Sequence, residues 1–148
     1  MSVDIEPLIE RSGLRYTKEV DPKGGVVRFG LPFDSQQGPI VVRVENYGDF
    51  LSVSAFLRSM DSIAVQGAVR DLLTDLLKLN AGPHGLARVG LWVLPQDETQ
   101  WILVVSELPG ALANQGILRS MVEDVAGLAE QVLMTIETRR TSRQTQLG

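Results

Sequence analysis

Residues 86–106 read LARVGLWVLPQDETQWILVVS, and this stretch decides the fold. Two strand-like runs, residues 86–94 and 100–106, flank the turn-forming residues 95–99, which predicts a β-hairpin. Both faces of each run carry apolar side chains, so neither face has the polar pattern of a solvated surface. Such strands lie at the centre of a sheet or have their second face covered, often by another chain.

A helix is predicted on each side of this hairpin. The first begins near Asp61 or Ser62, which can cap it, and ends at Asn80, ahead of Gly82 and Pro83. Its wide apolar arc consists of Val65, Val69, Leu72, Leu73, Leu76, Leu77 and Leu79. The second is a long closing helix whose apolar stripe consists of Leu118, Met121, Val122, Val125, Ala129, Val132, Leu133 and Ile136.

The N-terminal half has the pattern of a short helix followed by strands. Residues 3–11 predict an amphipathic helix that stops at Ser12 and Gly13. Residues 14–20 and 26–31 predict a hairpin around a turn at residues 21–25, and residues 40–45 and 51–58 alternate as two more strands. We therefore expect an α+β fold, an antiparallel sheet flanked by helices in the order α-β-β-β-β-α-β-β-α.

Length and charge place further limits on the protein. A chain of 148 residues fits one domain, which we assign to residues 1–137, with residues 138–148 as a flexible, polar, basic tail. The net charge is −4, but the tail holds three arginines and no acid, which leaves 11 basic against 18 acidic side chains in the body. An acidic body repels a phosphate backbone, so direct nucleic-acid binding is not expected.

The compartment is predicted from what the sequence lacks. There is no cysteine, so disulfides and thiolate ligands are excluded, as in many proteins of a reducing cytoplasm. The first ten residues carry three acids and no basic region of a secretory signal, and no apolar run has membrane-spanning length. We expect a cytoplasmic protein.

No motif for catalysis, for a cofactor or for a metal is found in the sequence. His84 is the only histidine and lies in a loop, without a nucleophile elbow that would make it part of a triad. Asp71 and Asp75 lie one helical turn apart, but two acids without a third ligand make a poor metal site. Nucleotide-binding glycine motifs are absent as well. The sequence therefore predicts that the protein is not an enzyme.

The two tryptophans are the most informative residues of the hairpin. Trp92 and Trp101 are predicted to be cross-strand neighbours, because the turn places them opposite each other. Such a pair stabilises a sheet, but tryptophan is also over-represented among the anchors of protein interfaces. Both interpretations stay open at the level of sequence.

The chain resembles the YbjN family over roughly its whole length in the order of its elements, and at the level of residues from Asp71 to Pro109. The residues that carry this resemblance are the helix end Leu-Leu-Lys-Leu-Asn at 76–80, Gly85, the strand pair, Glu107-Leu108-Pro109 and the long closing helix. The YbjN fold is similar to that of type III secretion chaperones, which are small, acidic, homodimeric proteins that hold extended segments of a client. The resemblance thus implies a dimer that binds polypeptide without a cofactor, although four strand-like runs, not three, precede the middle helix here.

Taken together, these patterns predict a non-enzymatic, homodimeric, chaperone-like protein that holds a partner polypeptide on apolar grooves or a sheet edge. The residues expected at the dimer or partner surface are Phe56, Leu73, Leu77, Trp92, Leu94 and Trp101. The alternatives are a small-ligand sensor and a nucleic-acid-associated factor that uses the arginine tail. The sequence leaves open whether the dimer uses the middle helices or the hairpin edge, and whether a terminal helix is swapped between protomers.

Overall fold

The computed structural model describes residues 4–20, 27–63 and 69–147 of the chain. Its strands form one antiparallel sheet in the order β1-β2-β3-β4-β6-β5. Their bounds are β1 (Thr17–Val20), β2 (Val27–Phe33), β3 (Ile40–Asn46), β4 (Phe50–Ser59), β5 (Arg88–Val93) and β6 (Gln100–Pro109). The predicted hairpins are confirmed, because β1 pairs with β2 and β5 pairs with β6, while the turn predicted at residues 21–25 lies outside the described residues.

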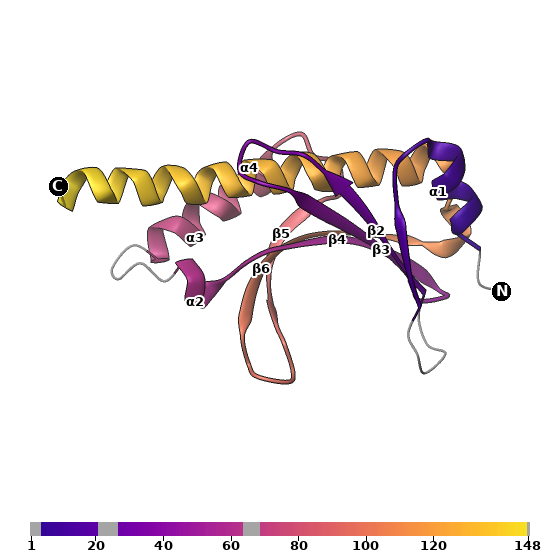
Figure 1. Cartoon of the computed structure of the whole chain (residues 1–148), viewed down its shortest axis with the longest axis horizontal. Helices are drawn as coiled ribbons and strands as arrows, with labels where there is room; N and C mark the ends of the chain where they lie inside the picture. The colour runs from indigo at the N-terminus through magenta and orange to yellow at the C-terminus, as the bar shows by residue number, and fades with distance from the viewer. Residues whose placement is uncertain (1–3, 21–26, 64–68, 148) are drawn as a thin grey trace.

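The helices lie mainly on one side of this sheet. They are α1 (Glu6–Ser12), α2 (Met60–Ile63), α3 (Val69–Lys78) and α4 (Gln115–Leu147), with short 3-10 turns η1 (Leu79–Ala81) and η2 (Gly110–Leu112). Helix α4 runs along the whole length of the sheet, α1 lies near its start, and α2 and α3 lie beneath its C-terminal half (Figure 1). The predicted α+β class and element order are confirmed.

Local sequence explains where the first helix begins and ends. Pro7 lies in the first turn of α1, where its missing N–H has no helical partner to lose. Gly13 ends the helix with a φ of 77°, a left-handed conformation that costs glycine nothing, and its N–H donates to the carbonyl of Glu10. Burial of Ile5 and Ile9 then fixes this short helix against the start of α4.

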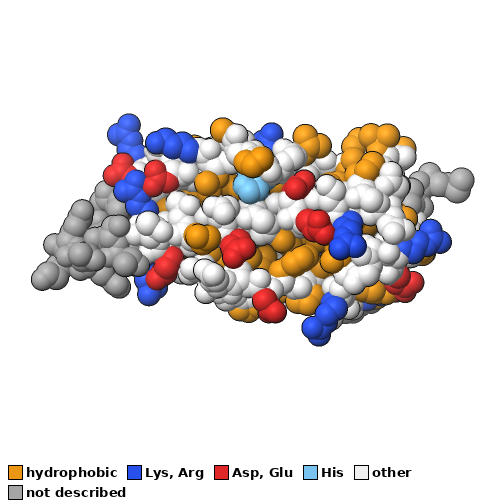
Figure 2. Space-filling model, turned by 90° about the horizontal axis from the view of Figure 1, so that it is seen from above, with side chains coloured by type: hydrophobic (Ala, Val, Ile, Leu, Met, Phe, Trp, Pro, Cys, Tyr) orange, Lys and Arg blue, Asp and Glu red, His pale blue; other side chains and the backbone are white. Residues whose placement is uncertain are grey.

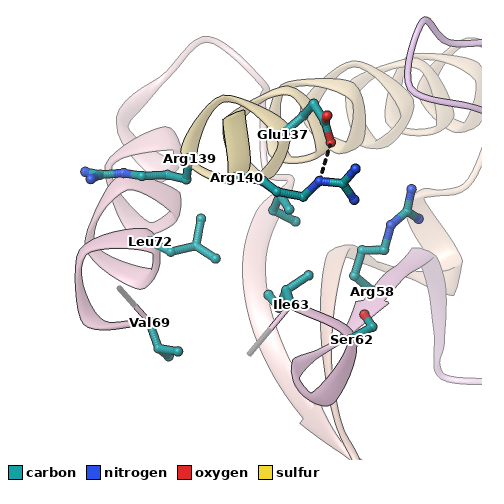
Figure 3. Close-up of a pocket in the computed structure, with 9 residues that line it drawn as sticks. Arg58, Ser62, Ile63, Val69, Leu72, Glu137, Arg139 and Arg140 are labelled. Carbon is teal, nitrogen blue, oxygen red and sulfur yellow. Dashed lines mark ion pairs between the residues drawn. The ribbon is translucent and has the colours of Figure 1, made fainter. Parts of the chain in front are cut away.

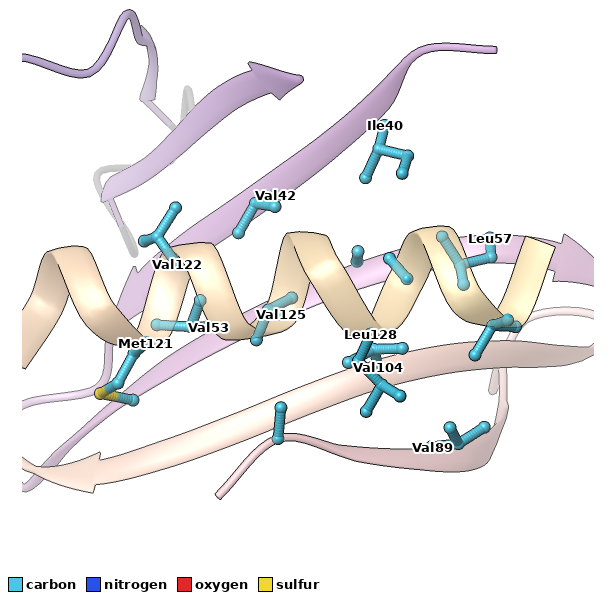
Figure 4. Packing of buried hydrophobic residues seen from close by; sticks show 14 of the residues in the cluster. Ile40, Val42, Val53, Leu57, Val89, Val104, Met121, Val122, Val125 and Leu128 are labelled. Carbon is cyan, nitrogen blue, oxygen red and sulfur yellow. The ribbon is translucent and has the colours of Figure 1, made fainter. Parts of the chain in front are cut away.

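The core is a single layer of apolar side chains between α4 and the sheet. All eight residues of the predicted α4 stripe are buried, and they face the alternate residues of the central strands (Figure 4). Those strand residues include Val42, Val44, Leu51, Val53, Ala55, Ile102 and Val104, each with no accessible surface. Apolar side chains that repeat every 3.6 residues in α4 pack in this layer against apolar side chains that alternate along the strands. This packing holds the helix on the sheet.

The middle helix is described in two parts, α2 and α3, because residues 64–68 between them, including Val65, lie outside the described residues. The C-terminal segment differs from the sequence prediction. Helix α4 continues to Leu147, through the segment predicted to be a flexible tail. Its extension has a tertiary anchor, because Nε of Arg139 lies 2.6 Å from a carboxylate oxygen of Asp75 on α3. A polar composition alone did not reveal this long-range ion pair.

The helix side has an ordinary solvated surface. Acidic and basic side chains are scattered over it, with hydrophobic side chains between them (Figure 2). No helix in the described part of the chain is long and apolar enough to cross a membrane.

Candidate protein-interaction surface

The sheet has a second face, opposite α4, which we call the open face. None of the described helices covers it, and the tip of the β5–β6 hairpin extends away from α4 (Figure 1). The strand register and the alternation of burial place on this face Val41, Arg43, Ser52, Ser54, Phe56, Gly90, Trp92, Trp101, Leu103, Val105 and Glu107. The helices cover the apolar side chains of one face only, so the apolar side chains of the open face have no described helix over them.

The apolar centre of the open face lies on three neighbouring strands. Leu103 on β6 is opposite Phe56 on β4 and Gly90 on β5, and Trp101 is opposite Trp92. Leu103 is only 6% exposed although no helix covers it, because large side chains flank it on its own strand and on β4. Trp92, at the outer edge of this group, stays 51% exposed. The result is an apolar surface that is partly folded onto itself and partly in solvent.

The other half of the open face, on β2 and β3, is polar and internally paired. Glu45 accepts a hydrogen bond of 2.7 Å from the hydroxyl of Tyr47 and forms an ion pair of 3.4 Å with Arg28. Burial, together with this bond to Glu45, raises the pKa of Tyr47 to about 12. The guanidinium of Arg43 lies 5.7 Å from the ring centre of Phe56, a cation–π contact at the border with the apolar half.

The outer edge of β5 is blocked at one point by the side chain of Asn80. Its Oδ1 accepts a bond of 2.7 Å from the N–H of Val89, and its Nδ2 donates a bond of 3.3 Å to the carbonyl of Val89. The amide group thus imitates a neighbouring strand residue at this position. Since Asn80 follows α3 directly, this contact also holds the end of the helix against the sheet.

Beyond Val89 the edge of β5 is open. Backbone groups of an antiparallel strand alternate in direction, and the N–H of Leu94 bonds inward to Thr99 while those of Val89 point outward. The N–H and C=O groups of Leu91 and Val93 therefore point outward too, and no bond to them is found among the described residues. The side chains of Leu91 and Val93 are 49% and 50% exposed.

The structure distributes the six predicted surface residues over two regions. Trp92 and Trp101 are cross-strand neighbours, as predicted, and Phe56 joins them on the open face. Leu94 lies at the inner end of the hairpin turn and is half-buried. On α3, Leu73 packs partly against the core, whereas Leu77 is 61% exposed. The structure therefore brings Phe56, Trp92 and Trp101 together on the open face, with Leu94 at the adjoining turn, and leaves the α3 leucines apart from them.

Sequence reasoning missed the structural role of Asn80. The sequence predicted Asn80 only as the end of the middle helix, but its side chain also binds the backbone of β5. Val89 lies nine residues after Asn80, and a hydrogen bond between two such residues leaves no periodic pattern in the sequence. The one available hint was an amide residue placed directly before a glycine-rich turn and a strand.

A cavity of about 300 Å³ lies between α2, α3 and the C-terminal half of α4 (Figure 3). Its apolar lining is formed by Ile63, Val69, Leu72 and Ile136. Arg58 and Arg140 point toward each other at its rim, while Arg139 extends to the far side, where it pairs with Asp75. The hydrogen bond from Arg139 lowers the pKa of the Asp75 carboxyl. One acid of the lining, Glu137, lies 3.9 Å from Arg140.

The residues considered as candidates for catalysis or metal binding do not lie together. His84 is a half-buried loop residue that lies near Gly127 of α4, and Asp75 is engaged by Arg139. No group of three or more potential metal-binding side chains occurs among the residues that the structure describes. The features that the described residues form are thus an uncovered sheet face, an open strand edge and a cavity.

The fold and the open face define a class of small α+β proteins in which one long helix covers a single antiparallel sheet. No family model and no curated protein matches this chain in sequence. Solved structures with the same fold include the two that follow. An uncharacterized protein from Methanothermobacter thermautotrophicus has a TM-score of 0.62 at 15% identity, covering 91% of this chain and 95% of that protein.

The second structure is YbjN from E. coli, proposed to be a transcription regulator. Its TM-score is 0.60 at 12% identity, and the alignment covers 92% of this chain and 90% of YbjN. The resemblance to YbjN is confirmed at the level of the fold. Identities this low establish the fold alone, since function belongs to the site.

Proposed function

We propose that this protein is a non-enzymatic, cytoplasmic, homodimeric binding module that holds an apolar segment of a partner polypeptide in a chaperone-like manner. The observation that carries the proposal is the uncovered apolar centre of the open face, built by Phe56, Trp92, Trp101 and Leu103. Burial of such aromatic side chains contributes most of the energy of protein interfaces.

The distribution of polar groups around this centre supports a polypeptide as the ligand. Arg43, Ser52 and Ser54 border the aromatic group with donors and acceptors, as at the polar rim of an interface. The indole N–H of Trp101 is buried and has no acceptor among the described residues. A buried donor without a partner is uncommon, and a bound backbone carbonyl would be a suitable acceptor once the side chain adjusts.

A binding measurement with an unfolded polypeptide tests this proposal. The probe is fluorescently labelled, reduced and carboxymethylated α-lactalbumin, titrated with the protein and followed by anisotropy. We expect saturable binding that weakens at least tenfold when Val41 and Phe56 on the open face are both replaced by Glu. The matched control is Leu112→Glu, which adds an acid at a position that is 58% exposed and outside the sheet.

Two results would contradict the open face as the binding surface. One is the absence of binding by the unmodified protein at concentrations up to 100 μM. The other is an equal loss of binding in the Leu112 variant, because an added negative charge would then explain the effect. Circular dichroism of each variant confirms that it is folded.

A second candidate function is supported by the cavity between α2, α3 and α4. Its apolar lining and the rim arginines Arg58 and Arg140 suit a small ligand with an apolar body and an anionic group. Decanoate should raise the melting temperature more than decanol does, and Arg58→Gln should remove that difference. Equal shifts from the two compounds would contradict an anion-specific site.

A role with nucleic acid is the weaker alternative, and it is worth testing because YbjN is proposed to regulate transcription. The arginines that suggested it are partly engaged, since Arg139 pairs with Asp75 and Arg140 lies near Glu137. We expect no DNA binding at physiological salt, measured by anisotropy of a labelled duplex. Salt-dependent binding that disappears on deletion of residues 138–148 would favour this alternative.

A further inference from the structure

We infer that two copies of this chain join β5 to β5, antiparallel, about a two-fold axis at Trp92, so that their sheets become one. The inference rests on the homodimer in the proposed function and names the surface and register of that dimer. It makes the second copy the occupant of the open edge and leaves the open face to the partner polypeptide.

The backbone of β5 limits pairing to a short window. On one side the outward groups of Val89 are already bonded to Asn80, and on the other side Pro95 has no N–H to donate. Leu91 and Val93 are the outward-facing residues between these limits. An antiparallel strand of the same sequence forms hydrogen bonds with the backbone groups of both residues when Leu91 faces Val93 of the second copy. This register places the symmetry axis at Trp92.

Side-chain sizes are complementary in this register. Trp92 faces Trp92 of the second copy on the open face, next to the Trp101 of each copy. Leu94 of the second copy faces Gly90, where even an added Cβ atom would meet nothing within 4 Å. A large side chain thus lies opposite an open space, and by symmetry this occurs twice.

Charge favours the same arrangement. Residues 89–94 read VGLWVL and carry no charge, so the axis lies in a neutral segment of an otherwise acidic protein. No like charges therefore meet where the two strands pair.

The middle helix is the less suitable dimer surface. Leu77 is well exposed, but its neighbours on α3 include Thr74, Lys78 and the Asp75 that is paired with Arg139. One leucine among polar side chains does not form an apolar patch. The exposed residues Leu91, Trp92 and Val93 are consecutive, and their strand also offers unpaired backbone groups.

A disulfide test distinguishes this register directly, because the chain has no cysteine of its own. In a non-hydrogen-bonded antiparallel pair the Cα atoms are about 4.5 Å apart, which is within disulfide range. Trp92→Cys is therefore expected to form covalent dimers in most molecules under mild oxidation at 20 μM. The control Leu112→Cys, exposed but outside β5, is expected to stay monomeric on a non-reducing gel.

A second pair of variants checks the register without removing a tryptophan. Leu91→Cys and Val93→Cys should each cross-link poorly alone and efficiently when mixed, because Leu91 faces Val93 across the axis and not itself. Leu91→Lys should weaken the dimer at least tenfold in sedimentation equilibrium. Its circular dichroism should remain that of the unmodified protein, since the side chain is half in solvent.

The possible outcomes separate the inference from the proposed function. Covalent dimers of Trp92→Cys together with mixed-only cross-linking support the β5 register. A stable dimer that shows neither cross-link overturns the register but keeps the homodimer. A strict monomer at 100 μM overturns both, while binding of the unfolded polypeptide is decided separately by the anisotropy experiment.

Discussion

The two edges of the sheet, β1 and β5, are built in opposite ways. β1 is exposed along its whole length and carries Lys18 and Glu19, and Nζ of Lys18 lies 2.7 Å from a carboxylate oxygen of Glu6. β5 carries an uncharged run that ends in Leu91, Trp92 and Val93. The protein therefore has one edge with the charges that discourage strand addition and one edge whose open part, beyond Val89, carries no charge.

This asymmetry follows from the same physical rule at both edges. Unpaired N–H and C=O groups attract another strand, and charges at such an edge make the approach costly. On β5 the corresponding device is Asn80, which occupies the backbone groups of a single residue, Val89. The edge is thereby limited in length but remains apolar, as expected for a surface with one intended partner.

The largest effect is expected from Asn80→Ala, which removes the amide that bonds the outward-pointing backbone groups of Val89. Val89 is buried, so its N–H and C=O lose their partner without access to bulk water, at a cost of about 1–3 kcal/mol in unfolding free energy. Chemical denaturation followed by circular dichroism measures this loss.

The conservative variant Asn80→Asp provides the control. A carboxylate still accepts the bond from the N–H of Val89 but cannot donate to its carbonyl, so we expect an intermediate loss. Equal stability of Asn80→Ala and the unmodified protein would show that the edge does not depend on this amide.

An intermediate effect is expected when the charges of β1 are removed with Lys18→Val and Glu19→Val together. The protein then has an apolar edge at each end of the sheet, and copies that pair through this edge as well as through β5, as we infer above, would form open chains instead of closed dimers. Sedimentation velocity should show species larger than the dimer, increasing with concentration.

A matched pair of substitutions separates edge chemistry from net charge. Lys78→Val with Glu123→Val removes the same two charges from exposed helix positions. This control should sediment like the unmodified protein. Larger species in both double variants would mean that loss of surface charge, and not an unprotected edge, causes the association.

Much of the fold follows from sequence because periodicity reports which side of an element is buried. All eight residues predicted for the α4 stripe are buried, although the equally buried Leu128 was missed, and the buried alternations of β3 and β4 were predicted as well. Gly13 and Gly82 also mark the ends of the elements before them, as expected for residues that stop helices.

Strand order and edge contacts could not be predicted in the same way. Apolar residues on both faces predicted either a central position or a covered second face for the hairpin strands, and the strand order makes β6 central and β5 an edge. Pairing between β4 and β6 joins residues about fifty positions apart, and the Asn80 and Arg139 contacts depend on that arrangement. The candidate surface was therefore predicted in its tryptophan pair and Phe56 but not in the limits that Asn80 imposes.

The smallest effect concerns alkaline pH, and it acts on the β1–β3 half of the sheet. A hydrogen bond to Glu10 and partial desolvation raise the pKa of Tyr16 to about 12, and the pKa of Tyr47 is raised to the same value. Both lie above the ordinary tyrosine value of 10.0. Glu6 raises the pKa of Lys18 as well.

The direction of the effect follows from proton linkage. Above pH 10 the unfolded chain releases its tyrosine protons first, while the folded protein keeps them until about pH 12, so stability declines as the pH rises through this interval. Tyr16→Phe and Tyr47→Phe should each make the decline in melting temperature between pH 10 and 12 shallower. In the double variant, the remaining decline in melting temperature should be the smaller one that comes from Lys18.

The β5 edge supplies the internal comparison for this last experiment. Residues 89–94 contain no titratable side chain, so association through Trp92 should stay constant over the pH range in which the protein remains folded. Sedimentation equilibrium at pH 8 and pH 10.5 measures it beside the melting curves. A dimer that dissociates in parallel with the tyrosine titration would place the contact on the β1–β3 half of the sheet instead of on β5.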